Sequence, residues 1–264
     1  MKHQILAMFF GAVLLSPFAV TAAEPQSMTQ KKTTDAHNHR GPKSFHIENG
    51  ESATITLFKP DLSSEILSAE MGKVTMPRTG VDNYHALVVE KDWGDHKEAI
   101  IHYQYMFGRP SHQSPAKLIA LEKTEFEITP EPLPREHYRY HSMQEWGFRL
   151  RLNGEYLSGQ PLTMATSHGS QQTKTTDKNG RATFLIPDDF PALVTGVRDK
   201  QSAQFTISSE VLHDNVTYST QYFADYRVNP SHWQSTELGF LVLGIGFLAG
   251  GYLGHSLKSR GEKA

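Results

Sequence analysis

Apolar and polar residues alternate in short runs along the middle of the chain, and turn residues interrupt these runs about every ten positions. The clearest run covers residues 100–107, where Tyr103 and Tyr105 fall on one face and His102 falls on the other. A period of two residues is typical of a strand with one buried face. No helical period of comparable strength occurs here, so the pattern predicts an all-β fold.

Each half of the chain contains a series of such runs. In the first half we expect strands over residues 45–47, 53–59, 73–76, 84–89, 100–107 and 117–121. In the second half we expect strands over residues 146–152, 161–167, 172–175, 182–186, 193–197, 204–208 and 216–223. Asn153–Gly154 suits a tight hairpin, and residues 177–180 suit a second turn. The number and spacing of the strands favour immunoglobulin-like β-sandwiches.

Three prolines separate the two series. They are Pro130, Pro132 and Pro134, and proline at this density makes a stiff, extended connector. We therefore place a domain boundary at this segment. The sequence predicts a first β domain over residues 44–129 and a second, β-sandwich domain over residues 130–230.

The N-terminal segment has the organisation of a secretory signal peptide. Lys2 precedes an apolar run, and small residues follow it up to Ala23. We expect cleavage after residues 1–23, and an uncleaved N-terminal anchor is the alternative. Residues 24–43 are polar and lack an apolar period, which predicts a flexible leader that contains histidine.

A second apolar segment lies near the C-terminus. Residues 238–257 contain no Lys, Arg, Asp or Glu. As an α-helix they cover about 30 Å, which matches the hydrocarbon core of a bilayer. The tail over residues 258–264 is basic, and basic residues remain on the cytoplasmic side. We predict one transmembrane helix in a bacterial inner membrane, in type I topology, with the main body in the periplasm.

Glycine recurs every four residues in this predicted helix, at Gly246, Gly250 and Gly254. Such spacing places small residues on one helix face, where a second helix can approach closely. This face is a candidate contact with a membrane-protein partner or with a second copy of the chain. The alternative is that these residues reflect the general frequency of glycine in transmembrane helices.

Composition excludes several classes of function. The formal net charge is -2, so the chain lacks the broad basic surface of a nucleic-acid-binding protein. It contains no cysteine, which excludes disulfides, thiolate metal sites and a cysteine nucleophile. It contains 14 histidines, roughly double the average usage for this length, and imidazole is a common metal ligand.

The first candidate metal ligands are His37, His39 and His46. His37 and His39 are two residues apart, so their side chains can point the same way in an extended chain. With Asp35 they offer ligands suited to Ni, Co, Cu or Zn. The alternative is a solvated polar tail. Beyond such a metal ion, the sequence predicts no cofactor.

A second candidate pair is His137 and His141. Four-residue spacing would align both imidazoles on a helix, but the preceding prolines make a helix doubtful and a loop pair more suitable. Polar packing between domains is the alternative. Single histidines on or beside predicted strands rank lower as ligands: His85, His96, His102, His112, His168 and His213.

Enzyme motifs are lacking. The sequence contains no G-x-S-x-G elbow, no H-E-x-x-H helix, no phosphate-binding glycine loop and no Rossmann fingerprint. Ser167–His168 and Asp188–Asp189 supply the residue types of a catalytic triad, but neighbours in sequence do not make a triad. We interpret Asp188–Asp189 as a turn and predict that the protein is not an enzyme.

Three segments of the second half carry a resemblance to a known family. They are Glu127–Pro130, Ser158–Leu162 and Thr176–Phe184, and the last reads TDKNGRATF. In this order they resemble the periplasmic family called domain of unknown function 4198, described as nickel-uptake transporter accessory proteins. The resemblance covers about residues 45–230 and implies an immunoglobulin-like fold and a role in metal uptake. It implies no set of ligand positions.

Together these features predict a membrane-anchored periplasmic accessory protein. Its β domains would bind or deliver a transition metal such as nickel or cobalt to a transporter, while the terminal helix docks beside that transporter or a second copy. The alternative is a non-catalytic interaction or structural module in which the histidines are incidental.

Overall fold

The computed structural model describes residues 28–29, 42–47, 52–135, 139–234 and 239–248 of the 264-residue chain. Most of these residues lie in strands. The strands are β1 (Met28–Thr29), β2 (Lys43–Ile47), β3 (Thr54–Phe58), β4 (Ser64–Leu67), β5 (Ala69–Glu70), β6 (Lys73–Met76), β7 (Val81–Asp92), β8 (His96–Met106), β9 (Arg109–Pro110), β10 (Phe126–Glu131), β11 (Tyr140–His141), β12 (Glu145–Leu152), β13 (Glu155–Tyr156), β14 (Pro161–Thr166), β15 (Gln171–Thr175), β16 (Arg181–Leu185), β17 (Ser202–His213) and β18 (Val216–Arg227). Two short helices, α1 (Pro115–Ala120) and the 3-10 helix η2 (Pro230–His232), complete the labelled elements.

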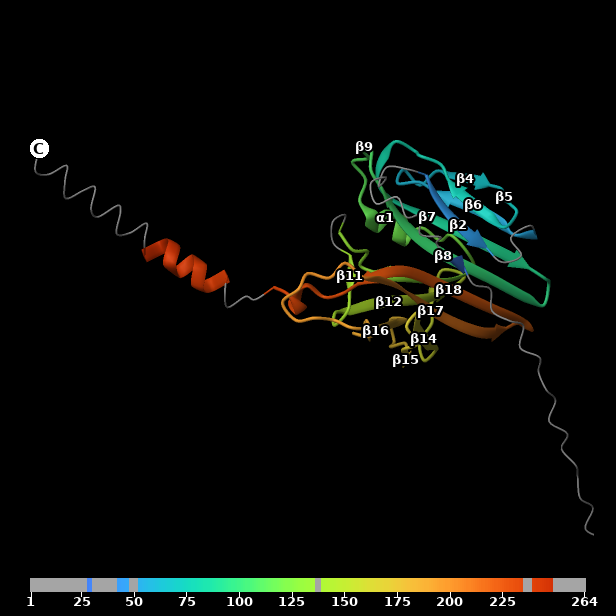
Figure 1. Ribbon diagram of the computed structural model, residues 1–264. Helices are drawn as coiled ribbons and strands as arrows, with labels where there is room; N and C mark the ends of the chain where they lie inside the picture. Colours follow the sequence, from blue (N-terminus) through green and yellow to red (C-terminus); the bar gives the residue numbers. More distant parts are fainter. Residues whose placement is uncertain (1–27, 30–41, 48–51, 136–138, 235–238, 249–264) are drawn as a thin grey trace, which may run out of the picture.

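One large sheet forms the centre of the body. Its strands follow the order β15-β14-β17-β18-β8-β7-β3-β4, with β11 paired to β18 and β9 paired to β7. Most neighbours are antiparallel, but β18 and β8 are parallel, with Thr217 opposite His96 and Tyr222 opposite Ile101. Strands from both predicted domains therefore belong to one sheet (Figure 1). The division into two domains stays a prediction.

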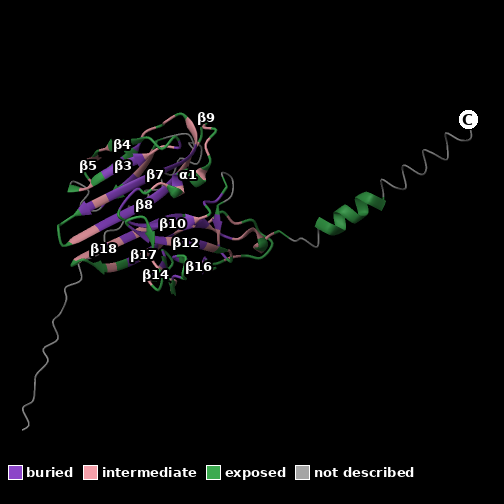
Figure 2. Cartoon of the chain, turned by 180° about the vertical axis from the view of Figure 1, so that it is seen from behind, coloured by how far each residue is buried: buried purple, intermediate pink, exposed green. Residues whose placement is uncertain are grey.

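Two smaller sheets cover the central sheet, one on each face. One contains β1, β2, β6 and β5, and the other contains β10, β12, β13 and β16. The buried side chains accordingly form two clusters. Phe45, Ile47 and Val74 belong to the first cluster, and Ile128, Phe148 and Phe184 belong to the second. Figure 2 shows the buried residues concentrated along the strands of these layers.

The middle of strand β7, residues 86–89, is apolar without interruption. Ala86 and Val88 point into the cluster under β10 and β12, while Leu87 and Val89 point into the cluster under β2 and β6. A strand that is covered on both faces loses the polar half of the alternating pattern. The same holds in β18, where Tyr222 and Phe223 enter opposite clusters.

The predicted all-β class is confirmed, and the packed sheets form a layered sandwich. The Asn153–Gly154 turn is also confirmed: both residues have positive φ, at 49° and 78°, and Leu152 pairs with Glu155 across it. The turn at residues 177–180 exists, but it connects two sheets, because β15 pairs with β14 and β16 pairs with β12.

Three local predictions were wrong. Residues 117–121 were expected to form a strand, but they belong largely to helix α1, where the Ser114 side chain accepts a hydrogen bond from Ala116 N. Residues 193–197 form a loop without strand pairing. The connector expected at Pro130 is part of β10, in which Pro130 pairs with Phe148. Proline is tolerated there because, within the described part of the chain, the opposite side of β10 has no neighbouring strand.

The described residues nearest the two ends of the chain are residues 28–29 and 239–248. Met28 and Thr29, which lie in the expected flexible leader, pair with β2. Residues 239–248 are helical, and the rest of the expected span over residues 238–257 lies outside the described residues. Among the described residues, no helix has both the length and the apolar character needed to cross a membrane. The predicted signal peptide over residues 1–23 and the tail over residues 258–264 also lie outside them.

Candidate functional site

Two of the five candidate metal ligands, His46 and His141, lie among the described residues. His37, His39 and His137 lie outside the described residues. His46 is exposed on β2. His141 is half-buried in β11, and burial lowers its pKa, with a further contribution from the charges of Arg227 and Arg139. Two neighbouring cations make this a poor environment for a metal ion.

No group of three or more His, Cys, Asp or Glu side chains that could hold a metal ion occurs in the described part of the chain. His46 and His141 therefore do not belong to such a group there. Gly246 is in the helical segment over residues 239–248, and a Cβ at this glycine would meet no atom within 4 Å. Gly250 and Gly254 lie outside the described residues, so the glycine contact face stays a prediction.

The two aspartates of the expected turn bind separate groups of side chains. Asp189 accepts hydrogen bonds from Tyr226 and from Thr166 Oγ1, the latter at 2.5 Å, and lies 3.6 Å from His168 Nδ1. Burial raises the pKa of Asp189, but these hydroxyl donors outweigh burial and hold it below its usual value. Asp189 is thus an ionised acceptor that joins β14 to β18.

Asp188 also joins separate segments of the chain through hydrogen bonds, near residues 229–232. Its Oδ1 accepts a hydrogen bond from Ser142 Oγ at 2.7 Å, and its Oδ2 lies 2.9 Å from His232 Nε2. Asn229 adds two contacts to Ser142: Asn229 N donates to Ser142 Oγ at 3.1 Å and Asn229 Nδ2 donates to Ser142 O at 2.6 Å. These hydrogen bonds hold residues 229–232, which follow β18, against the body.

Neither network has the order of a catalytic triad. A triad requires the serine to contact the histidine, which in turn contacts the carboxylate. Here Ser142 donates directly to Asp188, and Ser167 Oγ accepts a hydrogen bond from Gln204 N at 3.1 Å. These groups stabilise structure, and they supply no activated nucleophile.

A buried ionic cluster was not foreseen from the sequence. Glu127 on β10 stands directly opposite Arg151 on β12, and its Oε2 accepts from Arg151 Nη2 at 2.6 Å. Its Oε1 lies 2.5 Å from Lys123 Nζ. The side chains of Glu127 and Lys123 are fully buried, and that of Arg151 is 7% exposed. Lys123 Nζ and Arg151 Nη2 also donate to Leu121 O, close to the C-terminal end of helix α1.

Two further histidines are buried in the central sheet. His102 Nδ1 lies 3.0 Å from Phe223 O, and the His102 ring stacks on Phe223 with centroids 4.3 Å apart. His85 Nε2 lies 2.8 Å from Thr79 Oγ1. Burial lowers the pKa of both imidazoles. Both are therefore neutral near pH 7 and act as packed core residues.

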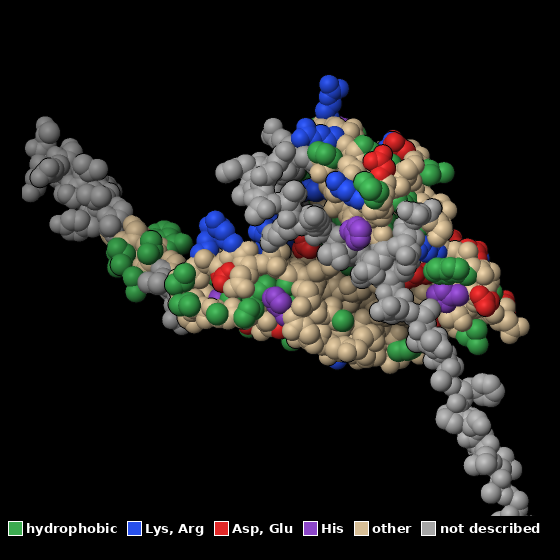
Figure 3. Space-filling model, turned by 45° about the vertical axis from the view of Figure 1, so that its right-hand side comes forward, with side chains coloured by type: hydrophobic (Ala, Val, Ile, Leu, Met, Phe, Trp, Pro, Cys, Tyr) green, Lys and Arg blue, Asp and Glu red, His purple; other side chains and the backbone are tan. Residues whose placement is uncertain are grey.

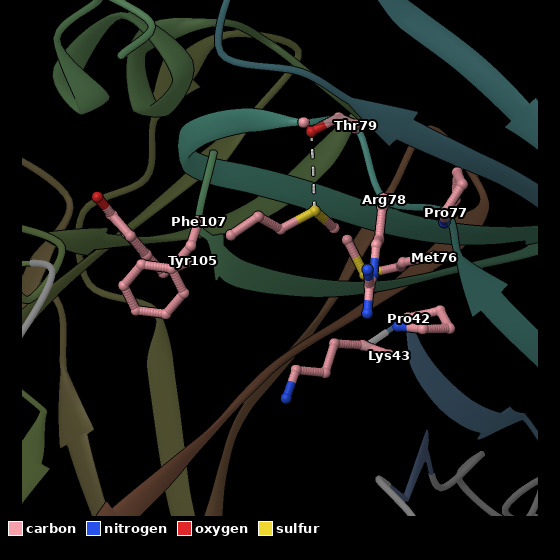
Figure 4. A pocket seen from close by; sticks show the side chains of 10 residues that line it. Pro42, Lys43, Met76, Pro77, Arg78, Thr79, Tyr105 and Phe107 are labelled. Carbon is pink, nitrogen blue, oxygen red and sulfur yellow. Dashed lines mark hydrogen bonds between the residues drawn. The ribbon is translucent and has the colours of Figure 1, made fainter. Parts of the chain in front are cut away.

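The described surface contains a hollow of about 230 Å³ between the β6–β7 connection and the end of β8 (Figure 4). Met76 and Met106 contribute thioether side chains, and Tyr105 lies across from the cations Lys43 and Arg78. The volume is below the roughly 300–1,000 Å³ of usual ligand pockets. Two cations beside an apolar lining suit a small anion with an apolar part, and they disfavour a metal cation.

Comparisons with known proteins add little to this picture. No protein-family model matches the chain, and no curated protein matches its sequence. Two solved structures align with it at low TM-scores. One is a Ca²⁺-stabilized adhesin that helps an Antarctic bacterium bind ice, at 14% identity over 78% of this chain and 49% of that chain, with a TM-score of 0.27. The other is the D0-D1 domain of intimin, at 11% identity over 71% of this chain and 90% of that chain, with a TM-score of 0.26.

This chain thus spans about half of the length of the adhesin. Both TM-scores are too low for an inference about fold or function to be carried over. The resemblance to the nickel-uptake accessory family, and the finer description of the sheets as immunoglobulin-like, stay predictions.

Proposed function

We propose that this chain is a membrane-anchored accessory protein that works by binding rather than by catalysis. The observation that carries the proposal is the helical segment over residues 239–248. All of its large apolar side chains are exposed: Phe240, Leu241, Val242, Leu243, Ile245, Phe247 and Leu248 are 57–78% exposed. They point in all directions around the helix, so packing on the body cannot cover them.

Transfer of these side chains from water to an apolar environment would contribute a large favourable free energy. Burial of one such side chain contributes about 1.5–3 kcal/mol, so the seven together contribute on the order of 10–20 kcal/mol. A bilayer surrounds a helix on all sides and can supply this burial. The sequence continues to residue 257 without Lys, Arg, Asp or Glu, which gives the length of a span. The basic tail supports an orientation with the body in the periplasm.

Membrane association can be tested on the full chain. We expect the full chain to float with phospholipid vesicles and to need detergent for extraction, whereas a chain that ends at Gln234 should remain in the aqueous fraction. Replacing Leu243 and Ile245 by arginine should weaken flotation, because each arginine at the centre of a span costs about 2.5–3.5 kcal/mol and two apolar side chains are lost as well. The matched variant with alanine at both positions should still float. A truncated chain that floats as well as the full chain would contradict the anchor.

Transition-metal capture is the second candidate function, and the pairing of β1 with β2 favours it. Thr29 lies opposite His46, and residues 30–41 connect these two neighbouring strands. In the sequence, His37 and His39 therefore lie between two strands that pair with each other beside His46. Closing the connection raises the effective concentration of these imidazoles near one another. This would suit nickel or cobalt delivery to a transporter.

Metal capture predicts a specific calorimetric result. Titration of the full chain in detergent with Ni, Co, Cu and Zn should show binding at pH 7 that is lost near pH 5, where protonated imidazoles release metal. Replacing His37 and His39 by alanine should weaken binding at least about tenfold. His213→Ala is the control, since His213 pairs with Asp214 on a different hairpin. Binding weaker than about 100 μM, or about -5.5 kcal/mol, would leave only the interaction-module interpretation.

A further inference from the structure

The loop over residues 193–200 presents apolar side chains to solvent. Val197 N donates to Val194 O at 3.2 Å, and Gly196 has a φ of +83°, which a residue with a side chain adopts only with strain. This turn directs Val194 and Val197 outward, and they are 60% and 58% exposed. Leu193, at the base of the loop, packs against the core. The loop is therefore fixed at its base and apolar at its tip.

The 193–200 loop contacts residues 229–234, the segment that precedes the helix over residues 239–248. Gly196 N donates to His232 O at 2.8 Å, and the His232 side chain is held by Asp188. Trp233 packs against the body. From Gln234 to the helix at residue 239 there are five residue steps, which span at most about 17 Å. Figure 1 shows the loop on the side of the body from which the helix departs.

Charge is distributed unequally along the body. The loop carries the exposed cations Arg198 and Lys200, and the carboxylate of Asp199 between them accepts hydrogen bonds from Gln201. At the other end of the central sheet, the tips of the β7–β8 and β17–β18 hairpins lie together, since Thr217 N donates to Asp95 O at 2.9 Å. Those tips expose Asp92, Asp95 and Asp214. Figure 3 shows basic side chains together with acidic ones near the helix, and several acidic side chains at the far end.

We propose that the tip of the 193–200 loop rests in the headgroup region of the bilayer and binds anionic lipid. This inference depends on the membrane anchor proposed above. Val194 and Val197 would enter the interface, while Arg198 and Lys200 contact lipid phosphates. A bilayer is the occupant that fits, because the short connection to the helix keeps the loop close to the membrane surface.

The expected energies explain how the contact works. A basic residue near an anionic membrane surface contributes about 1 kcal/mol, and each partly inserted valine contributes a similar amount. These contributions are too small to recruit a free protein. The anchor holds the loop at a high effective concentration at the surface, so even a weak contact fixes the orientation of the body. The acidic hairpin tips then point away from the membrane.

The absence of cysteine from the sequence makes a direct test simple. The full chain with Val197→Cys, labelled with an environment-sensitive fluorophore, is reconstituted into vesicles of equal parts phosphatidylcholine and phosphatidylglycerol. We expect a blue-shifted emission and quenching by spin-labelled lipid at least about twofold stronger than at the control position. The control is Leu212→Cys, which is 70% exposed at the far end of β17. Equal quenching at both positions would overturn the inference.

Charge and anchoring are tested separately. Replacing Arg198 and Lys200 by glutamine should lower the quenching at position 197 at least about twofold, whereas Lys178→Gln, on the distant 177–180 turn, should leave it unchanged. Quenching that is insensitive to both changes would overturn lipid binding by these cations. Protection of the fluorophore only when a second membrane protein is present would assign the loop to a protein partner instead. A chain that does not float with vesicles overturns the anchor itself, which flotation shows independently of fluorescence.

Discussion

Replacing Glu127 by alanine should lower the free energy of unfolding by about 3–5 kcal/mol at neutral pH. The substitution removes the only carboxylate that contacts Lys123 and Arg151 among the described ion pairs, and it leaves two cations in a site with almost no solvent access. Denaturant unfolding of the full chain in detergent, followed by tryptophan fluorescence, measures the loss. We also expect partial recovery at high pH, because burial already lowers the pKa of Lys123 and Glu127 opposes that effect.

Glu125→Ala is the matched control for this substitution. Glu125 lies two residues away and pairs with Lys97 at 2.8 Å, but these side chains are 47% and 29% exposed. Ion pairs at the surface contribute about 0–1 kcal/mol, so the control should unfold almost like the unaltered protein. If both substitutions lower the free energy of unfolding by the same amount, the buried cluster stabilises the fold no more than a solvent-exposed ion pair does.

Acidification from pH 7 to 5.5 should destabilise the body by up to about 4 kcal/mol. Burial lowers the pKa of three histidines in the folded state, namely His85, His102 and His141. In the unfolded chain each would titrate near its ordinary value of about 6.5. Each neutral histidine therefore stabilises the fold above that pH and loses its contribution as the pH falls toward the folded pKa, with a loss of at most about 1.3 kcal/mol for each over this interval.

Glu90 acts in the opposite direction, because burial raises its pKa and makes the folded state bind a proton more readily. Its contribution therefore opposes the loss from the three histidines. The measurement is the midpoint of denaturant unfolding at several pH values. His102→Leu should reduce the pH dependence, because it removes a buried imidazole whose pKa is lowered by burial. A midpoint that is constant between pH 7 and 5.5 would show that these imidazoles titrate normally in the fold.

Most strands could be predicted from the sequence, because alternation and β-branched runs act locally. Residues 73–76 illustrate this, since β6 has the predicted bounds. The errors arose where a local signal was overlooked or overridden. Ser114 followed by Pro115 is a helix start signal, and it predicts α1 better than the apolar content of residues 117–121 does. At Pro130, cross-strand pairing with β12 overrode the connector signal.

Long-range arrangement could not be predicted. The sequence gives no register, so it cannot show that Glu127 meets Arg151 or that His102 stacks on Phe223. For the same reason the 14 histidines suggested more metal chemistry than the described residues hold, where burial and existing partners account for His85 and His102. Of the residues in the ionic cluster, only Arg151 lies in a predicted strand, over residues 146–152, so the sequence pattern did not indicate its pairing with Glu127.

The position of β18 has a consequence for the biogenesis of the protein. It is the last strand among the described residues, yet it lies in the middle of the central sheet between β17 and β8. A nascent or prematurely terminated chain that lacks residues 216–227 has two open sheet edges in place of one continuous sheet. Open edges are templates for intermolecular pairing. Chains that end before residue 227 should therefore aggregate readily.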